Sequence, residues 1–171
     1  METWDAIRSR RDVRVYADRP IPAGDLDRIL EAGRRAPSSR NLQRWDFVVC
    51  VDRDQLRRLA GVWRGAGHVA GSAAAIALIA PDADDPRTRD SIQYDLGQAT
   101  MSMMLAAADL GVGSAHSAVA DQALARELLG FPEDRSCAWL ISLGYPAERP
   151  LVPLRRPARR PFEDVVHRDR W

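Results

Sequence analysis

The chain has 171 residues, a length typical of one compact domain, with 46% apolar and 29% charged residues. This balance excludes a disordered chain, and the net charge of +1 gives no overall attraction to nucleic acid or to an anionic membrane. All 25 basic residues are arginine. The lack of lysine excludes a Walker-A, Schiff-base or pyridoxal-phosphate lysine, so guanidinium or backbone N–H groups must hold any anion.

The two cysteines, Cys50 and Cys137, each lie in an apolar run and are expected to be buried free thiols. No Cys/His cluster has the spacing of a zinc site. The N-terminal residues have no apolar signal core, and no apolar run approaches the ~18 residues needed to span a membrane. We therefore expect a cytoplasmic protein without a membrane partner.

The first part of the chain predicts alternating helices and a strand. The expected elements are a helix at 3–9, a basic extended stretch at 10–22, a helix at 23–36, a polar loop at 38–41 and a strand at 45–51. Thr3 is expected to cap the first helix, and Pro37 stops the second. Asp52 with Gln55 resembles a capping box before a helix that reaches Trp63.

The second part continues the alternation. The expected elements are a buried strand at 73–80, a charged loop at 82–89, a helix from about 90 to 110, a strand at 114–119, a helix from Asp121 to Gly130 and a strand at 137–143. Residues 96–110 are apolar on most sides, so their helix must be covered all round, by its own domain or by a partner chain. Met101, Met103 and Met104 are expected in the core. Interleaved helices and strands favour an α/β or α+β class, with connections too irregular for a doubly wound sheet.

Three polar clusters are candidates for ligand binding. Residues 10–14 (RRDVR) place three guanidiniums where they can converge on one phosphate, although a solvated basic turn is the commoner structure. Residues 36–43 (APSSRNLQ) suit the edge of a planar heterocycle or a ribityl chain, or form an ordinary loop. Residues 155–161 (RRPARRP) form a basic tail, and nearby acidic residues argue against a nucleic-acid arm. His68 and His116 are expected to pack, or, for His116, to line a cleft.

Taken in order, these segments resemble the nitroreductase family of FMN-dependent oxidoreductases. The resemblance covers nearly the whole chain and rests on fragments in register at residues 10–14, 36–45, 95–99 (DLGQA), 105–107, 110–113 (LGVG), 143–146 (LGYP), 159–162 and 165–167. It implies an α+β sandwich with a central, mostly antiparallel sheet flanked by helices, in an intertwined homodimer with two FMN sites at the subunit interface. Residues 1–171 would form one FMN-binding domain, with a tail from about 147 extending along the partner subunit.

The resemblance also implies roles for individual residues. Contacts to the FMN phosphate and ribityl chain are expected from Arg10, Asp12 and Arg14, with Arg11 beside them, and from Arg159 or Arg160. Contacts to the partner's flavin are expected from Pro37, Ser38, Ser39, Asn41 and Gln43. The backbone of Ala118 and Val119 would meet the isoalloxazine edge, and Arg64 is a candidate for the positive charge near flavin N1.

The implied activity is hydride transfer from NADH or NADPH through the flavin to a small acceptor such as a nitroaromatic or quinone, with no catalytic side chain. Asp12 stands where the family usually has a small hydroxyl residue. An aspartate at this position resembles a subgroup of the fold, the flavin-cleaving dimethylbenzimidazole synthases. We expect Asp12 to pair with arginine, and we keep flavin cleavage and non-catalytic flavin binding as alternatives. A deazaflavin in place of FMN also stays open. Arg44 replaces the expected proline, and the short loop at 82–89 predicts an open pocket.

Overall fold

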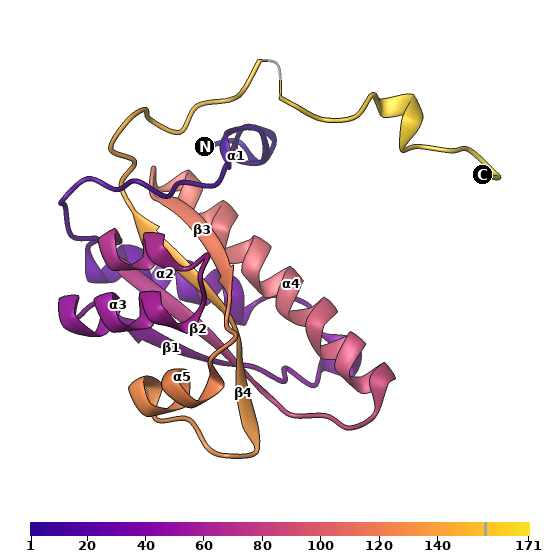
Figure 1. Cartoon of the computed structure of the whole chain (residues 1–171). Coiled ribbons are helices and arrows are strands. Elements are labelled where there is room, and N and C mark those ends of the chain that lie inside the picture. Colours follow the sequence, from indigo (N-terminus) through magenta and orange to yellow (C-terminus); the bar gives the residue numbers. More distant parts are fainter. Residues whose placement is uncertain (156) are drawn as a thin grey trace.

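The computed structural model describes residues 1–155 and 157–171, and helices alternate with strands along the chain (Figure 1). The α-helices are α1 (Thr3–Ser9), α2 (Ala23–Arg34), α3 (Arg53–Leu59), α4 (Pro86–Asp109) and α5 (Gln122–Leu129). The strands are β1 (Asp46–Cys50), β2 (Ala74–Pro81), β3 (Gly113–Ala118) and β4 (Arg135–Gly144). Short 3₁₀ turns span Ser39–Asn41, Ala60–Val62, Gly67–Gly71 and Phe162–Asp164. Arg156, in the basic tail, lies outside the described residues.

The four strands form one antiparallel sheet in the order β1-β2-β4-β3. β2 lies in the centre, and its residues alternate between the two faces of the sheet. Ile76 and Leu78 join the apolar cluster on one face, whereas Ala77 and Ile79 join the cluster on the other. The α+β class and the antiparallel sheet expected from the sequence are therefore confirmed.

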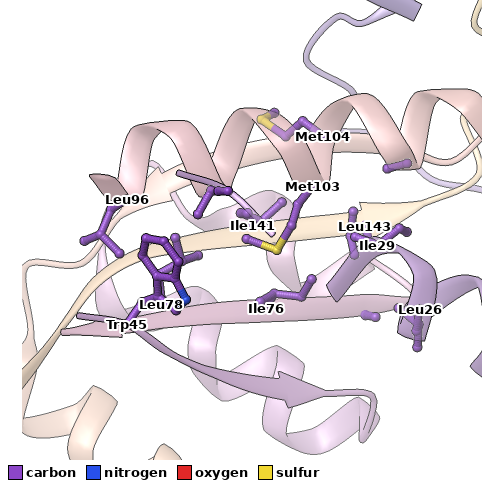
Figure 2. Packing of buried hydrophobic residues seen from close by; sticks show 14 of the residues in the cluster. Leu26, Ile29, Trp45, Ile76, Leu78, Leu96, Met103, Met104, Ile141 and Leu143 are labelled. Atoms are coloured by element: carbon purple, nitrogen blue, oxygen red, sulfur yellow. The ribbon is translucent and has the colours of Figure 1, made fainter. Parts of the chain in front are cut away.

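Helices cover both faces of this sheet. On one face, α2 and α4 pack together, and Met103 of α4 lies over Ile141 and Ile76 (Figure 2). On the other face, α3, α5 and two 3₁₀ turns enclose the second apolar cluster. The expectation that Met101 lies in the core is wrong, because 45% of its surface is exposed.

Several expected boundaries differ in the structure; α2 ends at Arg34 and β4 begins at Arg135, each two residues from the expected position. Glu2, and not Thr3, occupies the N-cap position of α1. α4 begins at Pro86 because the Asp85 carboxylate accepts hydrogen bonds from the Thr88 N–H (2.9 Å) and hydroxyl (2.7 Å), and proline suits the first turn of a helix. Trp63 lies beyond α3, in extended conformation after a 3₁₀ turn.

Both cysteines are buried free thiols, as expected. Burial raises the pKa of Cys50 to about 11 and that of Cys137 to about 12, so neither is a thiolate at neutral pH. Within residues 1–155 and 157–171, no group of three or more His, Cys, Asp or Glu side chains is arranged to hold a metal ion. The helices of this same part of the chain include none that is long and apolar enough to cross a membrane.

Candidate flavin site

The basic segment after α1 lies extended against the edge of the sheet. The Val13 N–H donates to the Ser114 carbonyl at 3.0 Å. Because alternate residues of an extended chain share a side, Arg10, Asp12 and Arg14 come together. The Asp12 carboxylate lies 3.1 Å from the Arg10 guanidinium and 3.5 Å from that of Arg14. The segment thus presents two cations on one side, around a single carboxylate.

Two glycines allow this segment to approach the sheet closely. Gly113 of β3 and Gly144 of β4 are register partners. A Cβ atom at Gly113 would lie 2.7 Å from the Val13 side chain, and one at Gly144 would lie 2.7 Å from the Tyr16 ring. A side chain at either position would therefore displace the segment that carries the arginines.

Arg11 points away from the other two guanidiniums and fastens the C-terminal segment. It donates to the carbonyls of Arg149 (2.7 Å) and Pro150 (3.3 Å). Burial and the nearby Arg149 charge lower the pKa of Arg11. Further along, the Leu154 N–H donates to the Arg8 carbonyl. Arg149, Pro150 and Leu154 therefore bond to their own chain, and the extension of the tail from about 147 along a partner subunit stays a prediction.

A hydroxyl network behind the segment was not foreseen from the sequence. The Ser142 hydroxyl lies 2.6 Å from the Tyr16 hydroxyl, 2.8 Å from His68 Nδ1 and 3.1 Å from the Ala115 carbonyl. Tyr16 donates its proton to the Val13 carbonyl, so the Tyr16 oxygen and the Ala115 carbonyl are both acceptors for the single Ser142 proton, and His68 Nδ1 donates to Ser142. Burial and the charge of Arg14 lower the pKa of His68. We therefore assign a neutral His68 whose Nε2 is free to accept.

The polar loop after α2 has an unusual backbone. Arg40, Asn41 and Gln43 have φ values of 54°, 56° and 48°, in the left-handed region. This conformation costs roughly 1–2 kcal/mol for a residue with a side chain, and less for asparagine. The loop is therefore held by its surroundings. Within the loop, the Ser38 hydroxyl accepts from the Gln43 N–H at 3.0 Å.

A second contact joins the loop to α4. Asp95 is only 1% exposed, and both its carboxylate oxygens accept from the Ser39 N–H at 3.0 Å. The Ser39 hydroxyl donates to the same carboxylate, also at 3.0 Å. No ion pair among the described residues includes Asp95. Sequence reasoning gave Asp95 no role, because its partner lies 56 residues away.

The loop and the arginine segment lie near different ends of α4 in one chain. The loop is tied to Asp95, in the first half of the helix. Val13 packs against Ala108, in the last turn. At 1.5 Å per helical residue, Asp95 and Ala108 are about 20 Å apart. One chain therefore brings Arg10, Asp12 and Arg14 together but keeps the predicted loop residues away from them.

The remaining predicted residues are dispersed. Ala118 is the last residue of β3, opposite Trp139, and Val119 follows it. Arg64 is exposed, with its guanidinium 5.1 Å from the centre of the Trp63 ring.

Arg159 and Arg160 lie in the part of the tail that extends away from the sheet and helices (Figure 1). Arg159 donates to the neighbouring Ala158 carbonyl and Arg160 to the Asp164 carbonyl. Within one chain, these two arginines therefore do not join the cluster at Arg10.

A cleft of about 350 Å³ lies between α4 and the sheet, with Arg10 at its margin. His116 and Trp139 line it and meet edge to face, with ring centres 5.8 Å apart. Met101 and Met104 complete its apolar side. His116 is exposed and lines this cleft, so the expectation that it packs in the interior is wrong and the alternative is confirmed. Such a lining suits a planar organic group or the side chains of a second protein chain.

Comparisons with known proteins agree on one family. The model of the nitroreductase family matches residues 7–72 and 59–145. A relative from Archaeoglobus fulgidus, named as an NADH dehydrogenase/NAD(P)H nitroreductase, is 34% identical over 174 residues, with 99% of each chain covered.

Solved structures share the fold. An FMN-dependent nitroreductase from Clostridium difficile is 27% identical, with a TM-score of 0.84, covering 97% of this chain and 98% of that one. The NADPH:FMN oxidoreductase of Vibrio harveyi, solved with NAD⁺, is 26% identical with the same TM-score, covering 97% of this chain and 76% of that one.

Proposed function

The chain belongs to the nitroreductase family, and on this premise we propose that it is an FMN-dependent oxidoreductase. It would pass hydride from NADH or NADPH to a small acceptor such as a nitroaromatic or a quinone. The observation that carries the proposal is the pair of guanidiniums, Arg10 and Arg14, gathered on one side of an extended segment. The names of the relatives, which include an NADPH-flavin oxidoreductase, support the reaction class.

The residues present fit an FMN phosphate. Each guanidinium has five N–H donors. Arg10 and Arg14 already face one anion, the Asp12 carboxylate, which leaves most of their donors for a second anion. Arginine suits a phosphate because its planar fork binds two oxygens and keeps its charge at any working pH.

The protein must also orient the flavin ring, and the contacts of Asp12 bear on the alternative of flavin cleavage. When bound, FMN supplies the hydride chemistry, so the protein needs no nucleophile. The backbone at Ala118 and Val119, at the end of β3, is the proposed support for the ring edge. Because Asp12 is engaged by two guanidiniums, its oxygens act as acceptors. This favours a binding role for Asp12 over an acid–base role in flavin cleavage.

We further propose that the complete site lies between two copies of the chain. α4 exposes Tyr94 and Met101, and the neighbouring α1 exposes Trp4 and Ile7. A twofold axis through the middle of α4 would cover this apolar stripe and pair the helix with its copy in antiparallel fashion. The first half of one α4 then meets the second half of the other. The loop at 37–43 would thereby reach the partner's arginine segment.

The tail also belongs in this proposal. Residues 157–171 are exposed and extend away from their own sheet (Figure 1). Along a partner subunit, they could bring Arg159 or Arg160 to the phosphate. The whole chain would then be one domain with a shared C-terminal arm, working in the cytoplasm, where both nicotinamide donors are made.

The test begins with the purified protein. We expect a yellow dimer by light scattering, release of FMN identified by mass, and anaerobic bleaching by NADH or NADPH. A colourless protein that takes up no added FMN would refute the proposal. Yellow protein that neither donor bleaches would favour a non-catalytic flavin-binding role, and a deazaflavin mass would change the cofactor.

A further inference from the structure

We infer that Asp95 is a positioning residue for the flavin: it fixes the shape of the loop at 37–43, which the partner's flavin contacts. The inference rests on the proposed function and adds a residue that lies outside the predicted binding set. Asp95 itself is only 1% exposed and lies behind the loop, out of reach of a ligand on the outer side of the loop.

The geometry joins one buried carboxylate to the start of the strained turn. All three hydrogen bonds come from Ser39, at 3.0 Å each. Arg40 and Asn41, which follow Ser39 directly, both have left-handed backbone angles. The other bond from this region to α4, from Arg44 to the Ser91 hydroxyl, is longer, at 3.3 Å. Asp95 therefore holds the turn at the point where its strain begins.

The chemistry of the contact requires a carboxylate. Ser39 directs an N–H and an O–H donor at the same group, and an ionised carboxylate offers acceptors on both oxygens with no competing proton. Asparagine at position 95 would place an NH₂ donor against the Ser39 N–H. A buried carboxylate is unfavourable unless hydrogen bonds compensate it, whereas an apolar residue at this helix position would be buried without that cost. We therefore assign the carboxylate a role in fixing the shape of the loop.

The consequence reaches the exposed side of the loop. Arg40 and Asn41 are exposed, and Leu42 is 52% exposed; within the loop, the Gln43 side-chain amide donates to the Asn41 carbonyl and to its side-chain oxygen, each at 3.2 Å. Without the Asp95 contact, the turn can relax toward ordinary backbone angles, and the Ser38 and Asn41 groups move. In the proposed dimer this would weaken the partner's flavin site and leave the chain's own arginine segment intact.

Mixed dimers test this prediction directly. We expect Asp95→Asn and Arg10→Ala homodimers each to bind FMN at least roughly tenfold more weakly than wild type. The two chains would carry different affinity tags, and the heterodimer would be titrated with FMN by flavin fluorescence. One of its sites joins the arginine segment of the Asp95→Asn chain to the loop of the Arg10→Ala chain. That site is intact, so we expect one FMN per heterodimer at wild-type affinity.

Two further variants sharpen the result. Ser39→Ala removes one of the three bonds and should weaken FMN binding by less than Asp95→Asn does. Asp109→Asn makes the same substitution on the same helix, at a carboxylate that binds Arg28 and the N-terminal amine. The FMN affinity of Asp109→Asn should stay within about twofold of wild type. This is a smaller change than the tenfold loss, equal to ~1.4 kcal/mol, expected for Asp95→Asn.

Each outcome of these titrations either supports or overturns the inference about Asp95. A heterodimer with no tight site would overturn the inference, because Asp95 would then act on its own chain or on folding. Wild-type affinity in the Asp95→Asn homodimer would overturn it too, while leaving the proposed function standing. If Asp95→Asn does not fold, Ser39→Ala in the same mixed dimer carries the test. Only wild-type protein that binds no FMN would count against the proposed function itself.

Discussion

The arginine segment and the loop at 37–43 are proposed to meet at one flavin, yet they are held in opposite ways. Residues 10–16 are extended and pressed against the glycines of the sheet edge, so the steric fit to the sheet fixes them. The loop has left-handed residues and is fixed by hydrogen bonds to Asp95 and Ser38. The first region should therefore be sensitive to added bulk, and the second to the loss of an acceptor.

The largest expected effect on flavin affinity comes from the arginine segment. Arg10→Ala or Arg14→Ala should each remove about 1.5–3 kcal/mol of FMN binding, because each loses a charge-assisted contact. The folded protein should be recovered largely without cofactor, as measured by flavin absorbance and FMN titration. Arg57→Ala, on the exposed side of α3, is the matched control and should keep its flavin. Full flavin in both test variants would remove the phosphate clamp from the proposal.

The steric side of the comparison is tested by Gly113→Ala. The new methyl group would collide with Val13, so we expect a loss of about 1–3 kcal/mol in the free energy of unfolding, together with weaker FMN binding. Urea denaturation and FMN titration measure the two effects. Gly24→Ala in α2 meets no atom within 4 Å and should be neutral or slightly stabilising. Equal behaviour of the two variants would contradict the close approach.

Asp12→Ser tests whether the carboxylate between the arginines serves FMN binding or flavin cleavage. If Asp12 serves binding, the variant frees donors on Arg10 and Arg14 and should keep or improve FMN affinity, with reduction by the nicotinamide donor nearly unchanged. The measurement that separates the alternatives is recovery of flavin after reduced wild-type protein is exposed to oxygen. Loss of flavin with a benzimidazole product, abolished in Asp12→Ser, would favour flavin cleavage.

The smallest expected effect concerns His68. Its pKa is lowered in the folded chain, so the unfolded chain takes up this proton first as the pH falls. Folding stability should therefore decrease between about pH 7.5 and about pH 5.5, and His68→Gln should make that decrease smaller. Urea denaturation at both pH values measures it. His167→Gln, in the exposed tail, is the control variant, and an unchanged slope in His68→Gln would contradict the assignment of a neutral, partly buried ring.

Local signals in the sequence were enough for most elements of the fold. Helical periodicity marks α2, short apolar runs mark the strands, and Asp52 and Asp121 are recognised as helix caps. These predictions succeed because the interactions lie within a few residues along the chain. They fail at α4, where Asp85 and Pro86 begin the helix inside a charged stretch that reads as a loop.

The sequence by itself determined the helices and strands, the resemblance to one family and the spacing that puts Arg10, Asp12 and Arg14 on one side of the chain. Only the tertiary structure decided that Arg11 turns to the C-terminal segment, that His68 bonds to Ser142, and that Asp95 bonds to Ser39. The last two contacts join residues 74 and 56 positions apart. Their side chains meet because the sheet and α4 pack in one particular register, and no local pattern encodes that register.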